Sequence, residues 1–174
     1  VGREDILELL DFDVAEKKGF EKIGHQGTFN ANPMSAASGI AALELIAAGG
    51  VCETASAQAA SLRRQINAVF ESEDVPWACY GEYSGFYIFT NPENLPLSPS
   101  SFDALQENHK ILKGAASPSL ITKLRLATIV NGVDFSGKPG GVVSAVHSDD
   151  DIEGTAAAVR AAIRMLKDEG DLAA

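Results

Sequence analysis

The sequence predicts an α+β fold in which helices cover one face of a small antiparallel sheet. Two short runs rich in aromatic and β-branched residues, 77–82 and 85–90, flank Tyr83-Ser84 and predict two strands joined by a turn. Long stretches with helical periodicity lie before and after these runs. The 174 residues are 45% hydrophobic and 22% charged, which is enough apolar material for a sizeable core.

The first fifty residues predict a short helix, a loop and a helix of small residues. Residues 3–10 have a broad apolar face and predict a helix, whereas the charged residues 11–22 indicate a surface loop. Asn32-Pro33 is typical of an N-cap followed by the first helical position. The helix that follows is rich in Ala, Ser and Gly, and Gly49-Gly50 ends it.

The remaining residues predict helices on both sides of the hairpin and a third strand before the last helix. Ser148 precedes that helix, and Asp151 stands at the spacing of a capping box. Its buried stripe begins at Ile152. The other predicted elements are a helix at 51–73, a loop with three prolines at 91–101, helices at 102–112 and 120–130, and a strand at 141–147.

Charge and composition exclude several classes of partner. The net charge of −10 argues against nucleic acid and against an anionic membrane surface, because both require clustered Lys and Arg. No apolar run approaches the roughly 20 residues that span a bilayer. Cys52 and Cys79 lack the spacing of a metal site or a disulfide framework. Two reduced thiols indicate a cytoplasmic protein that binds no metal.

Residues 25–33, HQGTFNANP, are the most informative stretch for function. Gly27 leaves backbone N–H groups accessible, and the Thr28 hydroxyl can donate to a phosphate oxygen. The start of the following helix also favours anions. The stretch is therefore a candidate anion site. The alternative is a tight approach to the helix in which Thr28 satisfies local backbone groups.

The same stretch, with its Ala- and Gly-rich helix, closely resembles the segment after the cofactor lysine in class III aminotransferases. The glutamate-1-semialdehyde aminomutase-like members are the most similar. The resemblance covers the chain from end to end and is to the C-terminal portion of these fold type I, pyridoxal-phosphate-dependent enzymes. Three further segments resemble family elements in the same order: residues 2–6 (GREDI), 84–86 (SGF) and 140–152 (GGVVSAVHSDDDI).

The resemblance implies a domain organisation and a shared site. Residues 1–50 would end the large cofactor domain and include a connecting helix. Residues 51–174 would form the small C-terminal domain, with its antiparallel sheet covered by helices. Thr28, together with Gly27, would bind the phosphate of pyridoxal phosphate held by the neighbouring subunit. A homodimer with a shared active site is therefore implied.

The resemblance also implies that the chain carries no catalytic residue of its own. In the family, the lysine that binds the cofactor covalently falls before the position of Val1. Lys17, Lys18 and Lys22 lie in a charged segment that indicates a solvated surface, whereas a catalytic lysine needs a pKa lowered by burial. The expected function is therefore part of an aminotransferase that acts on a small-molecule amino donor and acceptor and is inactive alone.

Two alternatives stay open at this stage. An aminomutase fragment is one, although Pro139 occupies the place of a glutamate in the aminomutases. A non-catalytic dimerisation module derived from such an enzyme is the other.

His25 is interpreted as a packing residue, and Ser144 with His147 lacks a carboxylate at the spacing of a triad. The acidic residues 149–151 are interpreted as a helix start rather than a metal site.

Overall fold

The computed structural model describes residues 2–25, 27–113, 117–135 and 138–172. The chain forms two compact units, Val1–Ala47 and Ala48–Ala174. The domain boundary after residue 50 remains a prediction. That the first unit is the remnant of a larger cofactor domain remains a prediction.

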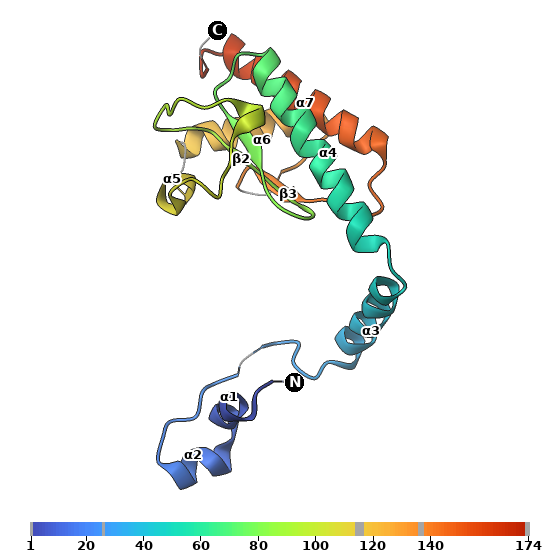
Figure 1. The fold of residues 1–174 in the computed structure, drawn as a ribbon, viewed down its shortest axis with the longest axis vertical. Helices are drawn as coiled ribbons and strands as arrows, with labels where there is room; N and C mark the ends of the chain where they lie inside the picture. The colour runs from blue at the N-terminus through green and yellow to red at the C-terminus, as the bar shows by residue number, and fades with distance from the viewer. Residues whose placement is uncertain (1, 26, 114–116, 136–137, 173–174) are drawn as a thin grey trace. The chain divides into compact units, whose positions relative to one another are not determined.

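The first unit is helical (Figure 1). Helix α1, Glu4–Leu7, continues into a 3₁₀ turn at Glu8–Leu10, and together they occupy the span predicted as one helix. Helix α2 spans Phe12–Lys18, so the loop predicted over residues 11–22 is wrong. Helix α3 spans Pro33–Ala47.

Local capping explains α2. The Asp11 carboxylate accepts hydrogen bonds from the backbone N–H groups of Asp13 (2.9 Å) and Val14 (3.2 Å), which fixes the first turn. Gly19 ends the helix in the left-handed conformation at φ 72°. The helix lacks an apolar stripe, and its caps alone mark its ends.

The second unit contains three strands and the longest helices of the described chain. Its sheet has the order β1-β2-β3, and both pairs are antiparallel. Phe86 pairs with Gly141 at the centre of the β2–β3 register. The predicted α+β class is confirmed. The elements are α4 Val51–Ser72, β1 Ala78–Tyr80, β2 Gly85–Phe89, a 3₁₀ turn at Pro99–Ser101, α5 His109–Lys113, α6 Pro118–Val130, β3 Gly140–Val142 and α7 Asp149–Asp168.

The core lies between the sheet and the long helices. Helix α4 packs against β1 and β2 and, on another side, against α7, which also packs against α6 (Figure 1). Apolar side chains at helical spacing on α4 and α7 are fully buried, so the predicted stripes are confirmed. The largest fully buried side chains of the core include Phe70 and Ile66 on α4, Leu124 on α6, and Ile163 and Leu166 on α7.

Two predicted elements are shorter than expected. Only His109–Lys113 of the predicted helix 102–112 is helical. Phe102 is instead extended, and its ring stacks on Phe89 with 5.4 Å between centroids. The predicted strand 141–147 ends at Val142, because the N–H of His147 donates to the Ser144 carbonyl (3.2 Å) and closes a turn.

Within the described ranges, no single helix is long and apolar enough to cross a membrane. The pair α3 and α4 meets the length and composition criteria only when the two helices are taken together.

Candidate functional site

Two consecutive turns carry Thr28 to the surface in front of α3. The N–H of Asn30 donates to the Gly27 carbonyl, and the N–H of Asn32 donates to the Phe29 carbonyl, each at 3.1 Å. Ala31, between them, has a φ of 57°. Thr28 lies within the first turn, and its side chain is exposed. A phosphate could therefore reach the hydroxyl.

Gly27 allows the Asn30 side chain to fold back over the first turn. A Cβ atom added at Gly27 would lie 2.6 Å from Oδ1 of Asn30, which is too close for any real contact. A larger residue at position 27 would therefore displace Asn30. Because Asn30 is exposed, its side chain can move away, so this contact alone does not require glycine at position 27.

The N-terminal donors of α3 are already paired, contrary to the expectation that the helix start is open to an anion. The Asn32 side chain accepts from the N–H groups of Met34 (2.9 Å) and Ser35 (3.1 Å). The Asn32 carbonyl accepts from Ala36 at 3.0 Å, and Pro33 has no N–H. The predicted N-cap is confirmed, and the helix can offer an anion its dipole but not these amides.

The open donors lie in the turns instead. Within the described residues, the backbone N–H groups of Thr28, Phe29 and Ala31 form no hydrogen bond, and neither does the Thr28 hydroxyl. All three residues are exposed. Successive free N–H groups beside a hydroxyl make a small donor set of the kind that binds phosphate oxygens. That Thr28 and Gly27 bind a phosphate stays a prediction.

The neighbours of this donor set add no charge. His25 is exposed and forms no hydrogen bond within the described residues, so the packing role expected for it is not found. Gln26 lies outside the described residues. The donor set therefore consists of neutral groups and the positive end of the α3 dipole.

Lys17 and Lys18 are exposed, as predicted for a solvated segment, whereas Lys22 is half-buried. The Lys18 ammonium donates to the Glu8 carboxylate at 2.5 Å. Lys22 lies over the ring of Phe12, 4.3 Å from its centroid. Lys17 is exposed on α2. None of the three has the buried surroundings of a lysine that forms a Schiff base.

Ser144 and His147 form a local turn rather than a nucleophilic site. Nδ1 of His147 lies 2.9 Å from the Ser144 hydroxyl and accepts the Ser144 backbone N–H at 3.0 Å. No carboxylate hydrogen-bonds to the imidazole within the described residues. The carboxylate of Asp151 bonds to Ser148 instead, and these bonds lower its pKa.

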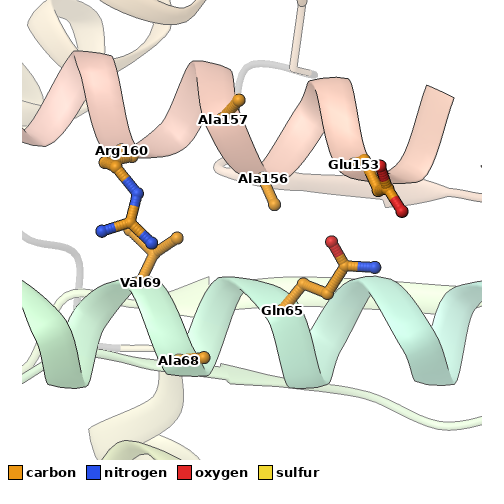
Figure 2. A pocket seen from close by; sticks show the side chains of 7 residues that line it. All are labelled: Gln65, Ala68, Val69, Glu153, Ala156, Ala157 and Arg160. Carbon is orange, nitrogen blue, oxygen red and sulfur yellow. The ribbon is translucent and has the colours of Figure 1, made fainter. Parts of the chain in front are cut away.

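A shallow groove lies between α4 and α7, and Figure 2 shows the side chains that line it. Gln65 projects from α4, and Arg160 projects from α7. The Arg160 guanidinium donates to Ser72 Oγ (2.8 Å) and Glu73 Oε1 (3.1 Å), so it is committed to the packing of the two helices. The lining contains no Ser, Cys, Lys or His, and its one carboxylate, Glu153, is exposed.

The remaining reactive groups are inert or isolated. Burial raises the pKa of the Cys79 thiol to about 12, so Cys79 cannot act as a nucleophile. Cys52 is exposed, and both cysteines are free. In the described part of the chain, no group of three His, Cys, Asp or Glu residues could hold a metal ion.

Comparison with known proteins shows the fold. No protein-family model matches the chain. An omega-transaminase from Sphaerobacter thermophilus is 20% identical, with a TM-score of 0.68 over 94% of this chain and 34% of that chain. A transaminase with bound PLP is 21% identical, with a TM-score of 0.69 over 99% of this chain and 35% of that chain. A β-phenylalanine aminotransferase from Variovorax paradoxus is 25% identical, with a TM-score of 0.63 over 98% of this chain and 35% of that chain.

The chain therefore spans about a third of the transaminase structures that it matches. It has the fold of part of a transaminase, with mixed helices and a small antiparallel sheet.

Proposed function

We propose that the chain is the C-terminal part of a pyridoxal-phosphate-dependent class III aminotransferase. Its reaction is transfer of an amino group between small molecules, and the chain is inactive without the rest of the protein. The observation that carries the proposal is the exposed donor set at Thr28, Phe29 and Ala31, on a chain with a transaminase-like fold.

The donor set fits the phosphate end of the cofactor. A phosphate oxygen could accept the Thr28 hydroxyl and the neighbouring N–H groups, while the α3 dipole favours the negative charge. When bound, pyridoxal phosphate supplies the electron sink for the reaction. The residues of this chain bind and orient the phosphate. The covalent anchor, a lysine, is supplied by another part of the protein.

The proposed assembly is a cytoplasmic homodimer with shared active sites. In it, Thr28 and Gly27 serve the cofactor held by the neighbouring subunit. Support comes from Lys17 and Lys18, which are exposed, and from Lys22, which lies over the Phe12 ring: none of them has the surroundings of a cofactor lysine.

Pro139 favours an aminotransferase over an aminomutase. It stands where the aminomutases carry a glutamate, and its carbonyl accepts the N–H of Ile88 at 2.8 Å beside β3. Position 139 therefore supplies no carboxylate and serves the sheet. An aminomutase fragment and a non-catalytic dimerisation module remain the second and third candidates.

The first test uses the purified chain. After incubation with pyridoxal phosphate and reduction with borohydride, mass spectrometry should find no stoichiometric adduct at a single lysine. One labelled residue among Lys17, Lys18 and Lys22, together with transaminase turnover, would show that the chain has its own cofactor lysine. Sequencing the gene across the codon for Val1 separates the enzyme part from the autonomous module.

The second test measures the role of Thr28. The chain is expressed together with the polypeptide encoded directly upstream of Val1, and cofactor binding is followed by absorbance. Thr28→Val should weaken binding roughly 10- to 100-fold, because it removes a hydrogen bond to a charged group. Thr28→Ser should retain binding. Thr54→Val, an exposed threonine on α4, is the matched control. Equal affinities for all variants would remove Thr28 from the site.

A further inference from the structure

Helix α3 is apolar around most of its circumference, and the first unit covers none of this surface. No residue of the helix is buried, and Glu44 is its only charged side chain. At about 100° per residue, Leu43, Leu45 and Ile46 point in three different directions. The large side chains of α3 are between 48% and 76% exposed: Met34, Ile40, Leu43, Leu45 and Ile46.

The first unit has no core that could cover this helix. Ala15 is its only buried residue among those described, whereas Phe12 and Phe29 are 74% and 71% exposed. Monomeric proteins rarely leave more than a few hundred Å² of contiguous apolar surface in water. A helix that is apolar all round belongs inside a protein or in a membrane.

We propose that α3 is a core helix, enclosed by the polypeptide that supplies the other two thirds of the transaminase-like fold. A second copy of this chain, meeting it across one interface, would cover one side of the helix and leave the others in water. Nearly all of this chain matches each of the three structures, but the matched part makes up only about a third of their length. They therefore contain additional polypeptide, which could cover a helix that is apolar on all sides.

A membrane is a poor fit for the same surface. Helix α3 meets the criteria for a span only in combination with α4. Leu62, Ile66 and Phe70 of α4 are buried in the core of the second unit, so α4 cannot also present them to lipid. The enclosing partner is therefore protein.

Enclosure of α3 also fixes the phosphate donor set. Thr28 lies one turn before Asn32, and the Asn32 side chain is bonded to the first turn of α3. A helix held on all sides therefore holds the donors in place. The inference rests on the proposed identity as part of a transaminase-like protein but does not depend on the cofactor.

Hydrogen–deuterium exchange without pyridoxal phosphate tests the inference. In the purified chain, α3 peptides should exchange at least about 100-fold faster than α4 and α7 peptides, because local opening is easy where nothing is buried. Expression together with the polypeptide encoded directly upstream of Val1 should protect α3. The double variant Leu43→Ser, Leu45→Ser should abolish that association. Leu105→Ser, which changes a leucine 79% exposed in the second unit, should leave it intact.

Four results would overturn the proposal. Protection of α3 in the isolated monomer would mean that it docks on its own chain. Protection that appears only with dimerisation, measured by light scattering, would assign it to a second copy. Protection on phosphatidylcholine vesicles would assign it to a membrane. An upstream polypeptide that is absent or leaves α3 unprotected would also overturn it. Loss of cofactor binding with α3 protected would instead contradict the proposed function alone.

Discussion

At the scale of single residues, Glu73 joins the two longest helices. It follows the last residue of α4, and its side chain is 11% exposed. The Glu73 carboxylate accepts hydrogen bonds from Arg164 (2.8 Å) and Arg160 (3.1 Å) on α7. The backbone carbonyl of Glu73 accepts a hydrogen bond from the Lys167 ammonium at 2.5 Å. The bond from Arg164, followed by that from Arg160, lowers the pKa of the Glu73 carboxyl against the opposing effect of burial.

Glu73→Gln should lower the free energy of unfolding by about 1–2 kcal/mol at neutral pH, because it removes two charge-assisted hydrogen bonds from partly exposed arginines. A carboxyl whose pKa is lowered in the folded state stabilises the fold at pH values above its ordinary pKa, which is 4.5 for glutamate. The difference between wild type and variant should therefore be constant from neutral pH down to about pH 5 and shrink below it. Urea unfolding at a series of pH values measures this.

The control for Glu73 is Glu153→Gln, which neutralises an exposed carboxylate on α7. It should change stability by less than about 0.5 kcal/mol. A Glu73→Gln effect that persists unchanged at pH 3 would show that the interaction does not depend on the ionised carboxylate.

At the scale of elements, the start of α7 is defined by a complete capping box. The Ser148 hydroxyl accepts from the N–H of Asp151 (3.2 Å), and the Asp151 carboxylate accepts from the N–H of Ser148 (2.7 Å). Ser148→Ala should therefore reduce the free energy of unfolding by about 1 kcal/mol in urea titrations. Ser117 stands at the same position of α6 but makes no side-chain cap. Ser117→Ala should have a clearly smaller effect, and equal effects would contradict the role given to the box.

The helix and strand positions show how far local sequence reaches. The caps of α3 and α7 and the glycines after α3 could be predicted, because their hydrogen bonds join residues within one turn. The same local logic was available for α2, where Asp11 and Gly19 mark both ends, but apolar periodicity gave no signal there. The helix expected at 102–112 failed for another reason: Phe102 gains more by stacking on Phe89, a contact across the fold.

At the scale of the whole molecule, burial is concentrated in one unit. Every buried residue in the described part of the chain except Ala15 lies beyond residue 47. Unfolding of the complete chain should therefore report the second unit alone.

A chain of residues 48–174 should fold cooperatively, with a free energy of unfolding within about 1 kcal/mol of that of the complete chain, because burial supplies most of the stabilisation. Urea titration followed by circular dichroism measures both proteins. The shorter chain should also bind less of a hydrophobic dye, since it lacks α3. A shorter chain that fails to unfold cooperatively would show that the first unit contributes to the core.

By itself, the sequence determined the α+β class, the hairpin and the caps of α3 and α7. All of these depend on periodicity or on contacts between near neighbours. Only the tertiary structure decided that the apolar residues of α3 stay uncovered within the first unit, whereas the buried stripes of α4 and α7 could be predicted. The leucines of α3 and α4 look alike in the sequence, yet Leu62 is 2% exposed and Leu43 is 66% exposed. Burial requires partners from distant parts of the chain, and the described residues of the first unit supply none for α3.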